Sequence, residues 1–234
     1  LGAVGKNITV FEYNNEIIIV DCGLMFPDGE TPGVDFIIPD FSYLKKHKKK
    51  VKGIIIESAG FAEVGSEGKK LQEESIALAH ENSIRLWGPN CMGLIDGHTG
   101  HVFSFLGEEN LWELLRPGNV SLIVQSGMLS AGFLMMILDR GGIGIAKMCS
   151  IGNKCDINEG DLLEYLIDDP ATDVIGLYVE SIVHARGFLD LCRSTAKPVV
   201  ILKGGQSPAG AMAAASHTAS MAGNYTKTSH AFRQ

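Results

Sequence analysis

Short apolar segments that alternate with single helix-like segments constrain this chain more than any other feature. From residue 118 onward the strand-like segments read NVSLIVQ, IAKMCSIG, DVIGLYVES and PVVILKGG. One helix-like segment separates each of them from the next, and two of these read SGMLSAGFLMMILDRGG and EGDLLEYLIDD. Strands joined through single helices form βαβ units. The pattern therefore predicts an α/β fold with a doubly wound parallel sheet.

The apolar residues of the helix-like segments recur at helical spacing, which predicts amphipathic helices. The faces expected to turn inward carry Leu129, Phe133, Met136 and Ile137 in the first helix and Ala185, Phe188, Leu189 and Cys192 in the last. Ligands of doubly wound sheets bind beyond the carboxyl ends of the strands. The segments QSG, SIGNK, VES and KGG fall at these ends, so we expect the functional site there.

The N-terminal part of the chain has a different sequence pattern. Residues 8–21 predict two strands joined by a turn at Asn14 and Asn15, because β-branched residues flank a pair that tolerates positive φ. Residues 45–52 hold six lysines, which favours a solvated helix end over a nucleic-acid patch. After them, VKGIIIES predicts a buried parallel strand, SEGKKLQEESIALAHENS a helix, and IRLWGPN another strand.

Composition and charge exclude several classes of function. The formal net charge is −7 and aromatic residues make up only 7% of the chain, so we expect no nucleic-acid binding. No apolar run approaches the roughly 20 residues of a membrane span, so we expect no membrane partner. The five cysteines never form a C-x-x-C pair, which is typical of reduced thiols in a cytoplasmic protein.

Two of the strand ends carry residues suited to phosphate chemistry. Ser126 and Gly127 follow a strand and open a helix, whose first N–H groups and dipole favour an anion such as phosphate. The alternative is that Ser126 only caps this helix. Glu180 ends the strand VIGLYVE, where it either accepts the ring N–H of a histidine or is an exposed loop residue.

His217 is the candidate histidine. It lies in the run AAASHTASMAG, whose small side chains leave space around the imidazole, and the glycines of the preceding GGQSPAG allow the loop to move. The alternative is a structural or merely exposed histidine. His98 and His101 lie three residues apart without a third ligand nearby, so we expect no metal site.

Residues 53–234 resemble the NDP-forming acyl-CoA synthetases, relatives of the α subunit of succinyl-CoA synthetase. The matching stretches occur in order and read SAGFAEVGSEGKKLQ, IRLWGPNCMG, PGNVSLIVQSG, SIGNKCDINEGDLLEYLIDDP, LYVES, KPVVILKGG and AAASHTASMAG. The resemblance implies a flavodoxin-like domain at 118–234 and a partial, Rossmann-like CoA-binding domain at 53–117. One departure is Ala219, where the family usually has glycine; we expect it to stiffen the loop without removing the chemistry.

The resemblance also implies a role for each candidate residue. His217 would be the phosphorylated histidine with Glu180 as its carboxylate partner, Ser126 and Gly127 would hold phosphate, and Asn90 and Cys91 would lie near the thiol end of coenzyme A. The implied reaction converts acyl-CoA, phosphate and ADP or GDP into acid, coenzyme A and the nucleoside triphosphate. It needs coenzyme A, a short-chain acyl substrate, and ATP or ADP with Mg on a partner ATP-grasp β subunit or domain. We therefore expect an oligomer.

Residues 1–52 resemble a different family. The stretch GKNITVFEYNNEIIIVDCGLMFPDG is similar to the start of ribonuclease J, a metallo-β-lactamase-fold ribonuclease, so the chain resembles a chimera joined at 51–54. It contains no H-x-H motif, so we do not expect the two-zinc site of that family. We expect residues 1–52, with their N-terminal β-hairpin segment, to pack poorly or unusually. Two alternative functions stay open: a non-catalytic module that binds coenzyme A or phosphate, and a ribonuclease.

Overall fold

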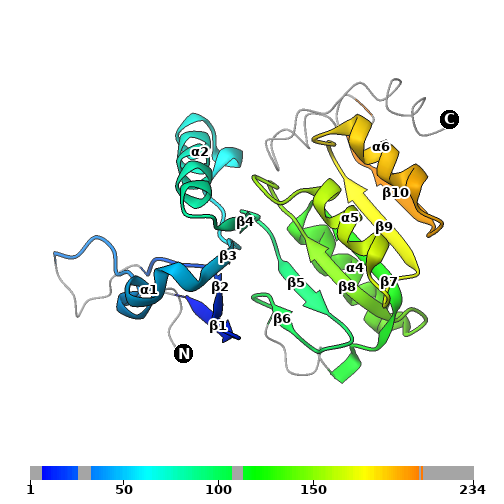
Figure 1. Ribbon diagram of the computed structural model, residues 1–234, viewed down its shortest axis with the longest axis horizontal. Coiled ribbons are helices and arrows are strands. Elements are labelled where there is room, and N and C mark those ends of the chain that lie inside the picture. Colours follow the sequence, from blue (N-terminus) through cyan, green and yellow to red (C-terminus); the bar gives the residue numbers. More distant parts are fainter. Residues whose placement is uncertain (1–6, 26–32, 107–112, 206, 208–234) are drawn as a thin grey trace.

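The computed structural model describes residues 7–25, 33–106, 113–205 and 207. These residues form a four-stranded sheet in the N-terminal part of the chain and a six-stranded sheet in the C-terminal part, which lie side by side (Figure 1). None of the helices in these ranges has the length and apolar character needed to cross a membrane.

The four-stranded sheet begins with the predicted hairpin. β1 (Thr9–Tyr13) pairs antiparallel with β2 (Glu16–Val20), and the chain turns at Asn14 and Asn15 with φ of 47° and 67°. β2 pairs in parallel with β3 (Val51–Ile55), which pairs in parallel with β4 (Arg85–Trp87). The hairpin and the strands that follow residue 50 therefore share one sheet.

Of the expectation that residues 1–52 pack poorly or unusually, poor packing is wrong for the inner strand of the hairpin. Ile17 and Ile19 of β2 are 0% and 7% exposed and form a small core with Val51. The partly buried side chains that pack against this core are Ile8, Leu44, Ile54 and Ile84. In contrast, every residue of β1 is exposed, although the ring of Phe11 packs edge-on against Phe103 with 4.6 Å between centroids.

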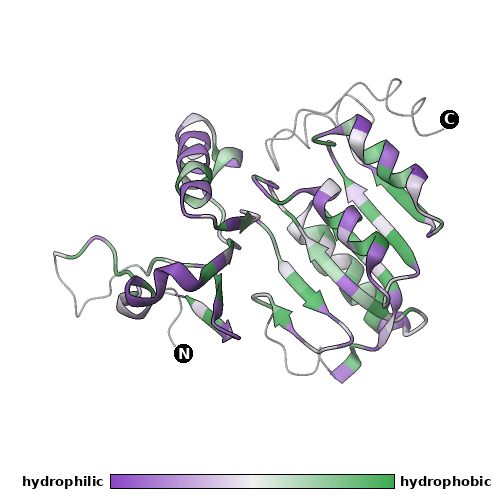
Figure 2. Ribbon diagram, in the orientation of Figure 1, coloured by the Kyte–Doolittle hydropathy of each residue, from purple (hydrophilic) through white to green (hydrophobic). Residues whose placement is uncertain are grey.

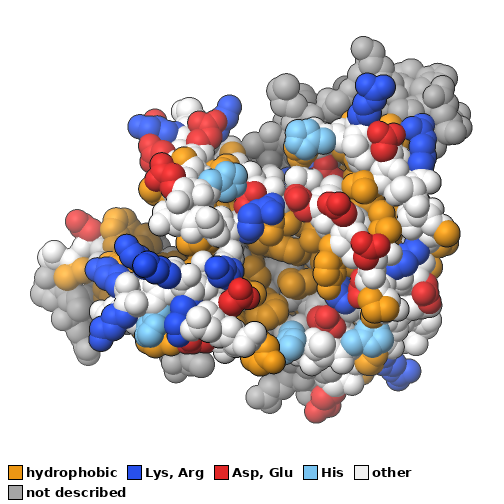
Figure 3. Space-filling model, viewed as in Figure 1, with side chains coloured by type: hydrophobic (Ala, Val, Ile, Leu, Met, Phe, Trp, Pro, Cys, Tyr) orange, Lys and Arg blue, Asp and Glu red, His pale blue; other side chains and the backbone are white. Residues whose placement is uncertain are grey.

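The helices of the N-terminal part are largely solvated. α1 (Ser42–His47) and the short η1 (Lys48–Lys50) bury none of their residues, which confirms the prediction of a solvated lysine-rich helix end. Figure 3 shows these lysines as a group of basic side chains on the N-terminal half. A single turn, η2 (Ala62–Val64), precedes α2 (Ser66–Glu81), and Figure 2 shows α2 as mostly hydrophilic.

The six-stranded sheet confirms the predicted doubly wound arrangement in its four parallel strands, to which it adds two antiparallel strands that were not predicted. Its strands are β5 (Gly93–Asp96), β6 (Val102–Phe103), β7 (Pro117–Val124), β8 (Ile145–Ser150), β9 (Val174–Val179) and β10 (Val199–Lys203). Their order is β10-β9-β7-β8-β5-β6, with β10, β9, β7 and β8 parallel and β5 antiparallel to both β8 and β6. After β7 the chain moves to β8 on one side, and it then returns to β9 and β10 on the other.

Helices cover both faces of this sheet. They are α4 (Gly127–Arg140), α5 (Glu159–Asp168) and α6 (Ala185–Ser194). Neighbouring residues of β7 point to opposite faces. Ile123 lies in a core with Leu163 of α5 and Phe188 of α6, whereas Val124 lies in a second core with Leu134 of α4. α4 therefore packs on one face, and α5 and α6 pack on the other.

The predicted buried face of α4 is wrong by one position. The residues that α4 buries are Ser130, Leu134 and Leu138, whereas Leu129 and Met136 are 37% and 45% exposed. The helix is apolar on most of its circumference, so periodicity alone did not fix its orientation. Phe133 and Ile137 pack only against the margin of the core, and in α6 the predicted Ala185 is exposed whereas Phe188 is buried.

Candidate functional site

Four parallel strands end at one edge of the six-stranded sheet. Val124, the last residue of β7, pairs with Tyr178 of β9 and with Ser150 of β8. Lys203, the last residue of β10, pairs with Val179. The four segments QSG, SIGNK, VES and KGG therefore meet at this edge. This is the place where doubly wound sheets bind their ligands.

Glu180 lies at this edge with its side chain buried. It is 4% exposed, which rules out the alternative of an exposed loop residue. The main-chain N–H of Glu180 donates to Oε1 of Gln125 over 2.8 Å, and the hydroxyl of Tyr178 lies 3.4 Å from a carboxylate oxygen of Glu180. A Cβ on Gly204 would lie 2.8 Å from that hydroxyl. The backbone can approach Tyr178 this closely because Gly204 has no side chain.

Ser126 and Gly127 begin α4 at the same edge. The hydroxyl of Ser126 accepts the N–H of Leu129 over 3.3 Å, so Ser126 does cap the helix. A cap satisfies one N–H group and leaves the positive end of the helix dipole facing the sheet edge. An anion is therefore still favoured at this position, and the phosphate-binding role of Ser126 and Gly127 stays a prediction.

Cys91 lies against the start of α4, and Asn90 precedes it in the chain. A Cβ built on Gly127 would lie 3.6–3.8 Å from the backbone of Cys91 and Met92, so the two segments are in contact. The thiol of Cys91 donates to the carbonyl of Ile56 over 3.3 Å, and burial raises its pKa far above the ordinary value. Cys91 is therefore an inert thiol, whereas Asn90 is only half-buried.

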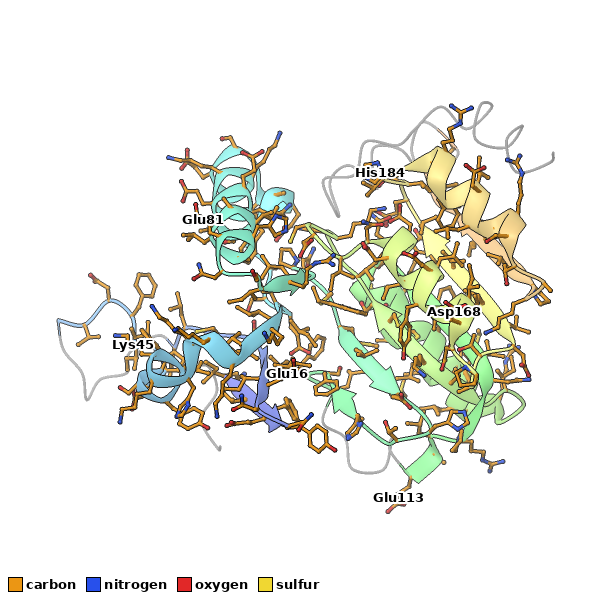
Figure 4. The ribbon with its side chains drawn as sticks, in the orientation of Figure 1. Glu16, Lys45, Glu81, Glu113, Asp168 and His184 are labelled. Carbon is orange, nitrogen blue, oxygen red and sulfur yellow. The ribbon has the colours of Figure 1, made fainter. Side chains whose placement is uncertain are left out.

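His217 lies outside the residues that the structure describes, so its position relative to Glu180 stays a prediction. Of the other histidines, His184 precedes α6, as labelled in Figure 4. Within the described part of the chain, no group of three or more His, Cys, Asp or Glu side chains is arranged to hold a metal ion.

A buried ion pair that the sequence did not predict lies next to Glu180. Nζ of Lys154 lies 2.8 Å from Oε2 of Glu159, and the two side chains are 4% and 1% exposed. The other carboxylate oxygen of Glu159 accepts the N–H of Val183 over 2.6 Å. Burial lowers the pKa of Lys154, although the charge of Glu159 opposes this effect. The segment SIGNK pointed to this region, but no spacing rule links its lysine to a glutamate at the start of α5.

Replacing Glu159 with glutamine is expected to destabilise the protein by about 3 kcal/mol at neutral pH. Glutamine keeps an acceptor for the N–H of Val183, but it leaves the ammonium of Lys154 buried without its countercharge. Without that countercharge the pKa of Lys154 in the folded protein falls further below its ordinary value of 10.5. The pH range in which the unfolded chain binds more protons than the folded protein therefore becomes wider. Stability rises with pH in that range. The loss of stability in E159Q should therefore be largest at pH values below the pKa of Lys154 in the folded variant. It should become smaller as the pH rises through that pKa.

Urea unfolding of wild type and E159Q at neutral and alkaline pH measures both effects. The double variant K154M/E159Q is the matched control, because it removes both charges and is expected to be more stable than E159Q alone. A deficit that is independent of pH would show that the lost charge is not its cause.

The chain is similar to parts of known acid–CoA ligases. The α subunit of the ADP-forming acetate–CoA ligase II from Pyrococcus furiosus is 39% identical over 189 residues, which are 80% of this chain and 40% of that subunit. A solved structure of dinucleotide-forming acetyl-coenzyme A synthetase 1 from Ca. Korarchaeum cryptofilum, in complex with phosphate and ADP, superimposes with a TM-score of 0.72 at 35% identity. It covers 81% of this chain and 40% of that one. The chain therefore spans less than half the length of these relatives.

A ribonuclease J from Corynebacterium glutamicum is also similar to part of the chain. It is 36% identical over 93 residues, which are 39% of this chain and 13% of that protein. This match is consistent with the second resemblance, although it is longer than the 52 residues that carry it.

The C-terminal half decides the family. The family model for the succinyl-CoA ligase like flavodoxin domain matches residues 117–234, which include every element from β7 onward. The fold of this half agrees with the match, since β7 to β10 form a parallel sheet covered on both faces. The chain therefore belongs to the family of succinyl-CoA ligase like flavodoxin domains.

Proposed function

We propose that this chain is the α-type part of an ADP-forming acid–CoA ligase and that it works through a phosphohistidine at His217. The overall reaction converts acyl-CoA, phosphate and ADP into acid, coenzyme A and ATP. The observation that carries the proposal is the buried carboxylate of Glu180, which lies at the same sheet edge as the start of α4. The similarity to acetate–CoA ligase α subunits over 80% of the chain supports it.

The phosphoryl step uses three groups of this chain. A ring nitrogen of His217 attacks the phosphorus of an acyl phosphate; a P–N bond forms, the P–O bond to the acyl group breaks, and the acid leaves as a carboxylate. Glu180 accepts the N–H of the other ring nitrogen and offsets the charge that develops on the imidazole. The start of α4, at Ser126 and Gly127, stabilises the phosphoryl oxygens.

Coenzyme A, which supplies the thiol of the thioester, would lie with that end beside Asn90 and Cys91. The contact between this segment and Gly127 supports the placement, because it brings the segment to the phosphate position. The buried thiol of Cys91 does not take part, so this residue would contribute its backbone.

The remaining parts of the reaction need a partner. We propose an ATP-grasp subunit or domain that holds ADP or ATP with Mg, a short-chain acid as substrate, and a cytoplasmic oligomer. The division into a ribonuclease J-like segment at 1–52, a partial CoA-binding domain at 53–117 and a ligase domain at 118–234 is proposed from the resemblances. The sheets cross both boundaries, because β2 pairs with β3 and β5 pairs with β8.

Incubation of the chain with acetyl phosphate tests the proposal without a partner. Intact-mass measurement is expected to show the gain of one phosphoryl group that is lost in acid and retained in base, as a phosphoramidate requires. Fragmentation should locate this group within residues 213–223. If the chain binds acetyl phosphate but gains no phosphoryl group, the non-catalytic binding module is the better description.

A further inference from the structure

The main chain at Glu180 and Ser181 is held by side chains from three neighbouring strand ends. Gln125, directly after β7, accepts both N–H groups through Oε1, at 2.8 Å from Glu180 and 3.3 Å from Ser181. Lys203, at the end of β10, donates to the carbonyl of Glu180 over 2.6 Å. Lys154, after β8, donates to the carbonyl of Ser181 over 2.7 Å. Each of the four polar main-chain groups of these two residues therefore has a partner.

This arrangement is costly for a merely structural purpose. Gln125 is 0% exposed and Lys154 8% exposed, and burial lowers the pKa values of both Lys154 and Lys203. Burying ammonium groups opposes folding, and apolar side chains of similar volume often give equal or greater stability. What these contacts provide is a fixed geometry. The three side chains restrict the movement of the backbone that carries the carboxylate of Glu180.

We propose that Gln125, Lys154 and Lys203 are positioning residues that fix the carboxylate of Glu180 for its contact with the reacting histidine. Two of them also bring positive charge to the edge where phosphoryl oxygens would arrive. Rigid support of a reacting group matters because a displacement of about 1 Å costs up to about 100-fold in rate. This inference rests on the proposed function, but one of its tests below does not depend on catalysis.

The first test compares variants of Lys203 in the reaction with acetyl phosphate. K203M removes the charge and the donor and is expected to lower the rate constant of phosphorylation by up to about 100-fold, with little change in the KM for acetyl phosphate. K203R restores a charged donor and should recover most of the rate. The matched control is K197M, since Lys197 makes the same kind of contact with the carbonyls of Leu166 and Asp169 at the opposite end of β10.

The second test measures amide hydrogen exchange at Glu180 and Ser181 and works even if the chain is not phosphorylated. K203M is expected to speed exchange at these two amides by about fivefold, whereas K197M should leave them unchanged. Unchanged exchange in K203M would overturn the inference, and so would a rate loss that K203R does not recover or that K197M reproduces. A wild-type chain that gains no phosphoryl group, with the expected exchange pattern, would instead contradict the proposed function alone.

Discussion

Replacing His217 with alanine is expected to reduce phosphorylation by acetyl phosphate to background, a loss of about 1000-fold or more. The imidazole is the nucleophile in the proposed step, and alanine supplies no atom that can accept the phosphoryl group. Because the surrounding residues are small, we expect the substitution to leave the stability of the chain unchanged. Acid-labile phosphate per chain, followed over time in wild type and H217A, measures the effect.

The remaining histidines provide the controls for this experiment. His80 lies 3.3 Å from a carboxylate oxygen of Asp156, and His98 lies 2.7 Å from the carbonyl of Gly118, so both rings already have partners. His184 is exposed and precedes α6, which makes H184A the most demanding control. We expect H184A to be phosphorylated at the wild-type rate. Phosphorylation that persists in H217A and disappears in H184A would reassign the nucleophile.

The sequence predicted β7 to β10 of the C-terminal sheet because each of these strands is a short apolar run and one helix lies between each two runs. It did not predict β5 and β6, which are short and follow no helix. It failed on the orientation of α4, where nearly every position is apolar and only packing against β7 and β8 selects Leu134 and Leu138. It predicted the hairpin but failed on its packing, since burial of Ile17 depends on pairing between β2 and β3 that no local pattern reveals.

For the site, sequence reasoning found the residues that stand at strand ends and missed those that act through the backbone. Glu180 was identifiable because a carboxylate directly after an apolar strand is unusual. The contacts of Gln125, Lys154 and Lys203 depend on how four strands are placed side by side, and the main-chain groups they bind are the same in every residue. No pattern of side chains in the sequence can therefore predict these contacts.

Replacing Glu180 with glutamine is expected to slow phosphorylation by about 100- to 1000-fold, the range typical of losing one aligned electrostatic group. Glutamine has nearly the same shape, and the contacts of the Glu180 main chain with Gln125 and Lys203 do not involve the carboxylate. Stability should therefore change little. What is lost is the negative charge that holds the ring N–H and offsets the charge developing on the imidazole. Single-turnover phosphorylation by acetyl phosphate measures the rate, and urea unfolding checks the fold.

The split between the rate constant and KM separates this role from simple binding. A carboxylate that acts through the histidine lowers the rate constant when it is removed and leaves the KM for acetyl phosphate nearly unchanged. Loss of a carboxylate that merely repels the phosphate would instead lower KM. Glu164, an exposed carboxylate on α5, gives the matched control E164Q, which should behave as wild type. Wild-type rates in E180Q would remove Glu180 from the mechanism, and the lysines around it would then have no carboxylate to position.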